Sequence, residues 1–282
     1  MTFLAARALP SPAVAILGVP FDATSTFRAG SAHAPDAIRW ASQSIETYSP
    51  VQRRDLEGVS FADLGNLDIS GLGPEGVVDA LRARLGAMPS STLPLVLGGE
   101  HTITLGAVTA AHQRYPGLAV LQLDAHTDLR NEYEDRSISH ATVMRRILDE
   151  VGGDDVVQVG VRAGTREEFE MASTLRFTSP RLAIPPAVWT WLEQRPVYIT
   201  LDIDVVDPAE APGTGNPEPE GVAAADLLAF VRRLGQLRVV VFDLVEVSPP
   251  YDPSGRTVVL AATIVREAIL AIAGRSDVGR RS

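Results

Sequence analysis

Three side chains of the types that bind metal ions follow one another in the stretch VLQLDAHTDLR. Asp124, His126 and Asp128 come directly after an apolar run and are spaced two residues apart. In an extended segment this spacing places all three side chains on one side of the chain. Two carboxylates and an imidazole that converge in this way repel one another, or stay protonated, unless a cation lies between them. Taken alone, the stretch is equally consistent with a metal site and with a polar turn whose aspartates cap the next helix.

Side chains of the same kinds follow other apolar runs of strand length. They are His101 in GGEHT, Asp202 and Asp204 in DID, and Glu246 in VEVSPPYD. In an open parallel sheet, ligands bind beyond the carboxyl ends of the strands. Independent polar turns would not concentrate these residue types at one end of the sheet, so we interpret them as parts of a single site.

The candidate metal ligands are two imidazoles and four carboxylates with no sulfur, namely His101, Asp124, His126, Asp128, Asp202 and Asp204. This donor set suits hard or borderline divalent ions such as Mn2+ better than a structural zinc. Four carboxylates balance two divalent cations in charge, and no lysine occurs in these motifs to replace one. The sequence therefore predicts a binuclear site in which two ions, about 3.5–4 Å apart, hold a hydroxide as a nucleophile.

The elements that position these side chains alternate between strand and helix. Apolar runs that barely alternate in polarity, as strands buried on both faces do, lie at 13–19, 93–97, 118–123, 156–161, 197–201 and 239–244. Helical patterns lie at 75–88, 104–115, 141–151, 223–234 and 257–273. This alternation predicts an α/β fold with a mainly parallel sheet and helices on both faces.

The chain is long enough to form one large domain. Its 282 residues are 45% hydrophobic, which suffices for a full core, and we expect one catalytic domain over residues 1–282. The segment DPAEAPGTGNPEPEG at 207–221 has the composition of a linker. Apolar strand and helix patterns flank it closely, so we expect an ordered loop.

Composition excludes several classes of function. The chain has no cysteine, which rules out disulfides, thiolate nucleophiles and Cys-ligated zinc and fits a cytoplasmic location. A net charge of -10 without a basic stripe argues against a non-specific nucleic-acid partner, and it is compatible with a small cationic substrate. No apolar stretch is long enough for a membrane span. The apolar N-terminus has no cationic region before it, and it is interrupted by prolines, which argues against a cleaved signal.

Several segments together resemble the signature motifs of the ureohydrolase (arginase/agmatinase) family, in the same order along the chain. They are GVPFDATSTFRAGSAHAPDAIR, GGEH, DAHTD, SHATVMRR, TLDIDVVDPAEAPGTGNPEPEG and VEVSPPYD. The resemblance covers nearly the whole chain, and the long TLDID segment is its most specific part. It implies a three-layer α/β/α sandwich, usually assembled as a homo-oligomer (trimer or hexamer), that hydrolyses guanidino or amidino groups.

The resemblance also assigns roles to the candidate ligands and to two further residues. It implies two Mn2+ ions bridged by Asp124 and Asp202, with His101 and Asp128 on one ion and His126 and Asp204 on the other. It implies that His140 in SHAT shuttles protons near the leaving amine and that Glu246 orients the guanidinium by paired hydrogen bonds. Without the resemblance, we would interpret His140 as a capping residue and Glu246 as an ordinary ion-paired carboxylate.

Four other positions have simpler interpretations. Many family members have Asp where this chain has Glu100, which is not a predicted ligand, and Gly where it has Ala141. An alanine there could shift the loop that carries His140 if the position needs a positive φ. We expect His112 to be exposed on a helix, and His33 to be an ordinary residue of the loop before a helix that opens at Pro35.

The far end of the substrate distinguishes the members of the family. The loop LRNEYEDRSIS after Asp128 is acidic, which favours a substrate that ends in an amine and penalises a carboxylate. This points to agmatine or an aminopropyl-extended agmatine, cleaved to urea and a polyamine (putrescine or spermidine), with Asn131 and Glu132 as contacts to the tail. Arg130 and Arg136 in the same loop could reverse the preference, and a solvated charged loop is the plainer interpretation.

Other functions stay open as alternatives. An arginase, a guanidino-acid ureohydrolase or a formimidoylglutamase would use the same metal chemistry. A ureohydrolase-like subunit that has lost catalysis and serves only in binding is the alternative that is not an enzyme, although such proteins typically lose a ligand. The chain has no GxSxG elbow for a serine hydrolase, and no P-loop for a nucleotide-binding protein.

Overall fold

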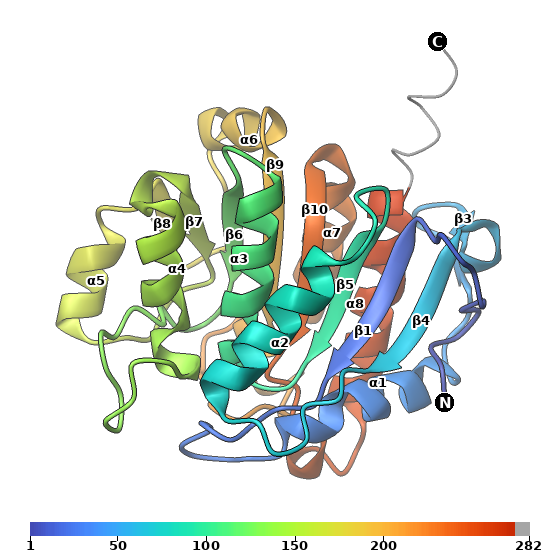
Figure 1. Cartoon of the computed structure of the whole chain (residues 1–282), viewed down its shortest axis with the longest axis horizontal. Helices are drawn as coiled ribbons and strands as arrows, with labels where there is room; N and C mark the ends of the chain where they lie inside the picture. Colours follow the sequence, from blue (N-terminus) through green and yellow to red (C-terminus); the bar gives the residue numbers. More distant parts are fainter. Residues whose placement is uncertain (274–282) are drawn as a thin grey trace.

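An eight-stranded sheet runs through the centre of the molecule in the computed structural model, which describes residues 1–273 (Figure 1). All its strand pairs are parallel. In spatial order the strands are β4 (Phe61–Asn66), β1 (Val14–Val19), β5 (Leu93–Gly98), β10 (Arg238–Val245), β9 (Pro196–Asp202), β6 (Ala119–Leu123), β7 (Val156–Val159) and β8 (Phe177–Ser179). A short hairpin of β2 (Tyr48–Ser49) and β3 (Arg54–Asp55) stands apart from it.

The six inner strands are the six that the apolar runs predict, to within two residues at either end. The two strands that the pattern misses, β4 and β8, are the edges of the sheet. Several of their side chains are only partly buried, so neither strand shows the continuous apolar run by which doubly covered strands are found.

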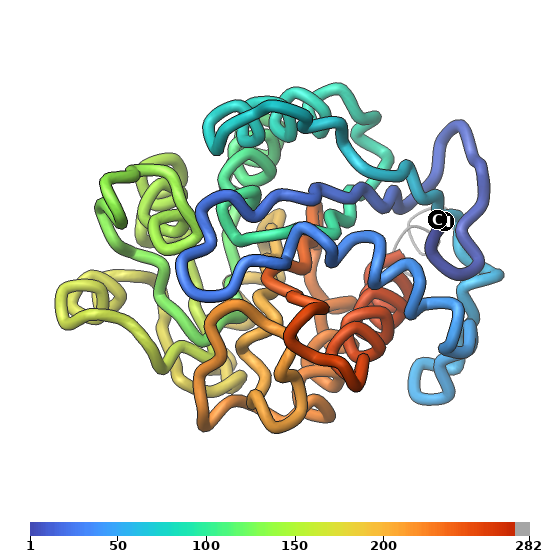
Figure 2. Tube along the Cα trace, turned by 90° about the horizontal axis from the view of Figure 1, so that it is seen from below, coloured from blue at the N-terminus to red at the C-terminus, as the bar shows by residue number. Residues whose placement is uncertain are grey.

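Helices cover both faces of the sheet and complete three layers, as predicted (Figures 1 and 2). One face carries α2 (Pro74–Gly86), α3 (Thr104–Arg114) and α4 (Val143–Val151). The other carries α1 (Ala34–Ser42), α6 (Pro186–Glu193), α7 (Ala224–Arg233) and α8 (Arg256–Ile272). A further helix, α5 (Arg166–Ala172), lies near β8. Two separate apolar cores result, because alternate residues of each strand point to opposite faces.

The helix expected to open at Pro35 is present as α1, with Pro35 in its first turn. Two other helices, α5 and α6, have no counterpart among the predicted helices, and each has eight residues or fewer. Their start signals are nevertheless present in the sequence. Thr165 and Glu168 form a capping box at the start of α5, and Pro186 lies in the first turn of α6.

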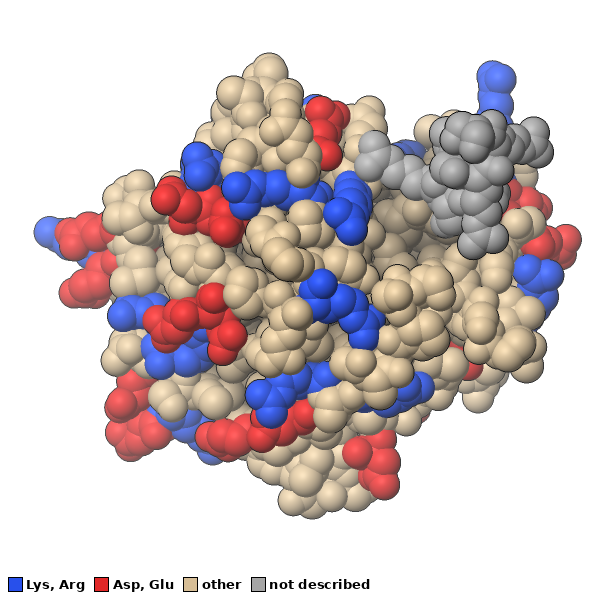
Figure 3. Space-filling view, turned by 45° about the horizontal axis from the view of Figure 1, so that its top comes forward, with Lys and Arg blue, Asp and Glu red and all other residues tan. Residues whose placement is uncertain are grey.

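The carboxyl ends of the strands lie together at the lower end of the molecule in Figure 1, which Figure 2 views directly. Loops from distant parts of the sequence meet there. The segment 207–221 is one of these loops: a backbone hydrogen bond from Asp207 to Val222 (3.0 Å) closes it, as expected for an ordered loop. The opposite end carries arginine and acidic side chains interspersed (Figure 3). No helix in the described part of the chain is long and apolar enough to cross a membrane.

Candidate metal centre

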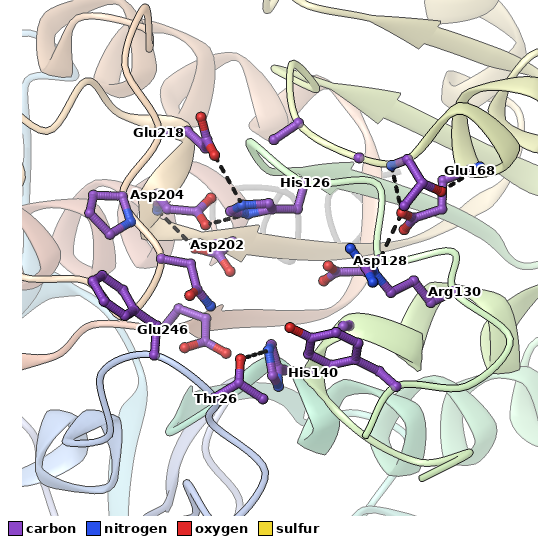
Figure 4. Close-up of a pocket in the computed structure, with 18 residues that line it drawn as sticks. Thr26, His126, Asp128, Arg130, His140, Glu168, Asp202, Asp204, Glu218 and Glu246 are labelled. Atoms are coloured by element: carbon purple, nitrogen blue, oxygen red, sulfur yellow. Dashed lines mark hydrogen bonds and ion pairs between the residues drawn. The ribbon is translucent and has the colours of Figure 1, made fainter. Parts of the chain in front are cut away.

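The candidate ligands all lie at the carboxyl ends of β5, β6 and β9, around the middle of the sheet. Figure 4 shows four of them, His126, Asp128, Asp202 and Asp204. His101 begins a short 3-10 helix after β5, and Asp202 is the last residue of β9. The glycine pair before His101 has a steric reason. A Cβ on Gly99 would lie 2.0 Å from the carbonyl oxygen of Phe21, so only glycine lets the loop after β1 approach this closely.

Five of the six predicted ligands form two overlapping groups. The first contains His101, Asp124 and Asp128, and the second contains Asp124, His126 and Asp204. The Nδ1 of His101 lies 3.1 Å from Asp124 Oδ2 and 2.9 Å from Asp128 Oδ2. The Nδ1 of His126 lies 2.8 Å from Asp204 Oδ2 and 3.7 Å from Asp124 Oδ1. Asp124 thus presents one oxygen to each group, which is the arrangement that a bridging ligand requires.

Asp202 lies beside these groups and belongs to neither. Its Oδ2 is 3.7 Å from the Nδ1 of His101, and its Oδ1 accepts a hydrogen bond from the backbone N–H of Asp204 (2.8 Å). The same edge therefore brings all six predicted ligands together.

The surroundings of His101 give a further reason to expect a metal ion in the first group. The Nδ1 of His101 is buried and has no hydrogen-bond partner in the described part of the chain, although two carboxylate oxygens lie close to it. The other ring nitrogen, Nε2, forms a hydrogen bond of 2.8 Å with Thr200 Oγ1. Ligating histidines are usually oriented in this way, with one nitrogen held by a neighbour and the other aimed at the ion.

Electrostatics in the ion-free protein show how crowded the carboxylates are. Burial, together with the charges of Asp204 and Asp124, raises the pKa of Asp202 well above its ordinary value. Burial and the charge of Asp124 raise the pKa of Asp128 to about 6. The imidazoles respond in the opposite sense: burial lowers the pKa of His101, but the Asp124 and Asp128 carboxylates outweigh it and raise that pKa well above its ordinary value. The cluster thus retains protons where a bound cation would supply positive charge.

Backbone strain also marks this site. Asp128 has φ 53° and Glu246 has φ 62°, which are left-handed conformations that residues other than glycine rarely adopt. Such strain persists only where the surroundings enforce it, and it concentrates at functional sites. At Glu246, one enforcing contact is the hydrogen bond of 2.7 Å from the backbone N–H of His101 to Glu246 Oε1.

The two predicted catalytic side chains line a cavity next to the ligands. Glu246 is buried, and burial together with the Glu100 carboxylate raises its pKa well above the ordinary value. Burial, with His126 and His101 when these are protonated, lowers the pKa of His140 to about 4. A neutral imidazole and a carboxyl group without a cationic partner therefore face the same space.

The cavity has a volume of about 470 Å³, the size of a small-molecule site. Besides the predicted residues, it is lined by side chains that the sequence analysis did not assign to the site: Thr26, Phe27, Tyr133, Glu168, Asn216 and Glu218. Two of them had signals in the sequence. Glu168 completes a capping box, and Glu218 lies in the long TLDID segment that resembles the family motif.

Known proteins match this chain over most of its length. The sequence model of the arginase family matches residues 12–271. The chain belongs to the arginase family. An agmatinase from Bacillus subtilis is 38% identical over 279 residues, covering 95% of each chain. A guanidinobutyrase from Pseudomonas aeruginosa is 32% identical over 275 residues, covering 92% of this chain and 86% of that one.

Solved structures agree with the sequence comparison. An agmatine ureohydrolase of Thermoplasma volcanium superposes with a TM-score of 0.86 at 36% identity, covering 96% of this chain and 94% of that one. The predicted family and fold are thereby confirmed. This arginase-family protein is a metal-dependent ureohydrolase of the agmatinase-like type.

The predicted tail contacts of this arginase-family protein lie outside the cavity. Asn131 and Glu132 are exposed and line a neighbouring hollow, and Asn131 Oδ1 accepts a hydrogen bond from Arg146 (2.8 Å). The loop instead directs Arg130 and Tyr133 into the cavity. The guanidinium of Arg130 lies 4.5 Å from the centre of the Tyr133 ring.

Three smaller expectations from the sequence concern Ala141, His33 and His112 of this arginase-family protein, and the one for His112 is wrong. Ala141 lies within the 3-10 helix His140–Thr142 and has no positive φ, so it causes no strain beside His140. His33 is exposed just before α1 and does not line the cavity. His112 is half-buried rather than exposed, because α3 packs between α2 and α4.

Proposed function

We propose that this protein is an agmatinase that hydrolyses the guanidino group of agmatine to urea and putrescine. An aminopropyl-extended agmatine, which would yield spermidine, is the second candidate substrate. The observation that supports the proposal most strongly is the pair of His/Asp groups that share Asp124, beside a cavity that contains Glu246. The higher identity to an agmatinase (38%) than to a guanidinobutyrase (32%) supports the choice of substrate.

Two Mn2+ ions are the cofactors that we propose. His101 and Asp128 would hold one ion, His126 and Asp204 would hold the other, and Asp124 would bridge them. Asp202, whose Oδ2 lies 3.7 Å from the Nδ1 of His101, would be the second bridging ligand. Two divalent ions at such a site supply a nucleophile from water near neutral pH.

Glu246 would bind and orient the guanidinium. A carboxylate can accept two parallel, charge-assisted hydrogen bonds from this planar group. Because the pKa of Glu246 is raised while the cavity is free of cations, an arriving guanidinium would favour its ionised form.

His140 would carry the proton to the leaving amine. Its pKa of about 4 keeps the ring neutral at pH 7, so that it can accept a proton released near the ligands. The ring nitrogens lie within reach of Thr24 and Thr26, and the ring stands edge-on to Tyr133 at 6.0 Å between centres. General acid–base catalysis of this kind contributes about 10²- to 10⁴-fold to the rate.

The tail of the substrate would meet Glu218. This side chain lines the cavity, is 40% exposed, and places Oε1 4.0 Å from the Nε2 of His126. The competing cation, Arg130, lies 3.6 Å from Glu168 and stacks on Tyr133, so part of its charge is already compensated. An amine-ended tail is therefore favoured in this cavity over a carboxylate-ended one.

The substrate is tested by urea release from Mn2+-loaded protein with a panel of compounds: agmatine, aminopropylagmatine, arginine, guanidinobutyrate and formiminoglutamate (assayed for formamide). We expect turnover to be confined to the two amine-ended compounds, and their ratio identifies the physiological one. Preference for arginine or guanidinobutyrate would make the protein an arginase or a guanidino-acid hydrolase. Bound metal without turnover of any compound would favour the inactive binding subunit.

The role of Glu218 is tested by Glu218→Gln. The charge lies at a partly exposed position, so its loss should raise the KM for agmatine about fivefold, roughly 1 kcal/mol, and leave kcat within about twofold. Glu220→Gln changes an exposed carboxylate two residues away that does not line the cavity, and it should leave both constants unchanged. If Glu132→Gln raises the KM for agmatine instead, the substrate tail contacts the acidic loop after Asp128 and not Glu218.

The assembly and location of the protein are also part of the proposal. We infer a cytoplasmic homo-oligomer, a trimer or hexamer, with no nucleic-acid or membrane partner. Light scattering on the purified full chain distinguishes these states from a monomer.

A further inference from the structure

Glu100 is a fully buried carboxylate that belongs to neither His/Asp group. Among the described residues, no arginine or histidine forms an ion pair with it. Four hydrogen-bond donors converge on it instead. Oε1 accepts from the hydroxyls of Thr24 (2.5 Å) and Thr102 (2.7 Å), and Oε2 accepts from the backbone N–H of Thr24 (2.7 Å) and the hydroxyl of Ser25 (3.3 Å). Glu100 therefore acts as an acceptor that holds the loop after β1 against the end of β5.

Thr24 connects this carboxylate to His140. Its Oγ1 lies 3.2 Å from the backbone nitrogen of His140, which donates to it, and 3.4 Å from the ring atom Nδ1. The side chain is buried, so water does not compete for these contacts. One hydroxyl group is thus shared between a carboxylate on one side and an imidazole on the other.

A count of protons determines the direction of these hydrogen bonds. A threonine hydroxyl has one proton and two acceptor positions. The Thr102 hydroxyl oxygen lies 3.1 Å from that of Thr24, but Thr102 donates its own proton to Glu100. Because Thr24 also donates its proton to Glu100, its two acceptor positions are left for the backbone N–H and the Nδ1 of His140. The ring nitrogen that faces Thr24 must then carry a proton. The opposite tautomer would leave two lone pairs facing each other in a buried position, which is unfavourable.

We propose that Glu100, acting through Thr24, is a positioning residue that sets the tautomer of His140, with the proton on Nδ1 and an acceptor lone pair on Nε2. The inference rests on the proposed function, in which His140 accepts the transferred proton, here on Nε2. Nε2 is the nitrogen on the side of Thr26, whose Oγ1 lies 3.5 Å away and whose side chain lines the cavity (Figure 4). The lone pair is accordingly presented to the substrate side.

The length of the Glu100 side chain matters for this arrangement. An aspartate at this position would end about 1.5 Å earlier, the length of one carbon–carbon bond. It could not keep the hydrogen bonds to both Thr24 and Thr102 without a movement of the backbone.

The test measures the tautomer of His140 by NMR and the reaction by steady-state kinetics, in separate experiments. Histidine labelled with ¹⁵N and ¹³C in the ion-free full chain reports which ring nitrogen carries the proton, since Mn2+ would broaden the signals. The chain has five histidines, and His140→Asn identifies the signal of interest. Thr24→Val removes the shared hydroxyl at nearly constant shape, Thr24→Ser keeps it, and Ser25→Ala removes a donor to Glu100 that does not contact His140.

We expect His140 to carry its proton on Nδ1 in the native chain, in Thr24→Ser and in Ser25→Ala. In Thr24→Val the signal should move toward the Nε2-protonated form. With Mn2+ and agmatine, kcat of Thr24→Val should fall about 10- to 100-fold while KM stays within about twofold, because proton transfer rather than binding is impaired. Thr24→Ser should recover most of the rate.

A second variant keeps the test independent of the folding of Thr24→Val. In Glu100→Gln the amide can donate to Thr24 and reverse the hydroxyl, so His140 should again shift toward the Nε2-protonated form. An Nε2-protonated His140 in the native chain, or an unchanged tautomer in both variants, would overturn the proposal and leave the agmatinase function untouched. The expected shifts in a chain that hydrolyses none of the guanidino compounds would support the positioning role and refute the proposed function.

Discussion

Replacing Asp124 by asparagine is expected to lower kcat/KM for ureohydrolysis by more than about 100-fold. Removing a residue that only supports a metal ligand typically costs about 10- to 100-fold, and the loss of a shared ligand should exceed that. Asp124 is the one side chain that belongs to both His/Asp groups, with Oδ2 toward His101 and Oδ1 toward His126. An amide offers one neutral oxygen in place of two charged ones, so it cannot bridge two cations in the same way. Urea release and the metal content of the dialysed protein measure both consequences.

A matched control is available on the surface. Asp79 on α2 is exposed, and among residues 1–273 its one ion-pair partner is Arg82, so Asp79→Asn removes the same charge from the protein without touching the site. It should retain full activity and full metal content. If Asp124→Asn binds two ions per chain and turns over agmatine like the control, the two groups do not form a shared centre.

The stability of the ion-free protein is expected to fall as the pH rises above about 6.5. The pKa values of His101 and His126 are raised above 6.5 in the folded state, because neighbouring carboxylates outweigh the effect of burial. Asp202 and Glu246 also have raised pKa values. The folded chain therefore binds more protons than the unfolded chain in this range, and stability is lost as those protons leave. The lowered pKa of His140 acts in the opposite sense, but only below about 6.5.

Thermal melts in a chelator and in excess Mn2+ measure this effect. One pKa unit corresponds to about 1.4 kcal/mol, and 1 kcal/mol moves the melting temperature of a chain of this size by about 2–3 °C. We expect the ion-free melting temperature to fall steadily across the range. Mn2+ should restore more stability at the higher pH, because it replaces protons at the same side chains. A chelated protein whose melting temperature stays constant or rises with pH would contradict the raised pKa values.

Much of the site could be predicted because its residues stand next to the strands that carry them. The spacing of Asp124, His126 and Asp128 after an apolar run is a local pattern, and the same holds for Asp202 and Asp204. Strands buried on both faces are recognisable from composition alone, so the carboxyl edge of the sheet could be located before the fold was known. The structure then brought all six predicted ligands to that edge.

Contacts to the substrate tail are harder to predict from the sequence, for a different reason. The tail prediction chose Asn131 and Glu132 because their loop is acidic, but whether a loop residue faces a cavity depends on how the loop bends. Here left-handed residues at Glu134 and Asp135 turn the chain back, and a hydrogen-bonded bridge joins Tyr133 to Arg136. Glu218 comes from a loop more than 80 positions further along the chain. Its segment belongs to the TLDID motif, but no local pattern shows that its side chain lines the cavity.

The sequence by itself determined the chemical class of the ligands, the parallel arrangement of the inner strands and the edge at which they act, because each of these follows from residues that are neighbours in the chain. The tertiary structure decided what depends on strand order and loop approach: which His and Asp side chains group together, which carboxylates line the cavity, and the contacts of Thr24 with Glu100 and His140. Those contacts join loops that follow three different strands, β1, β5 and β6. Their distances are set by the packing of the whole sheet, which no local pattern encodes.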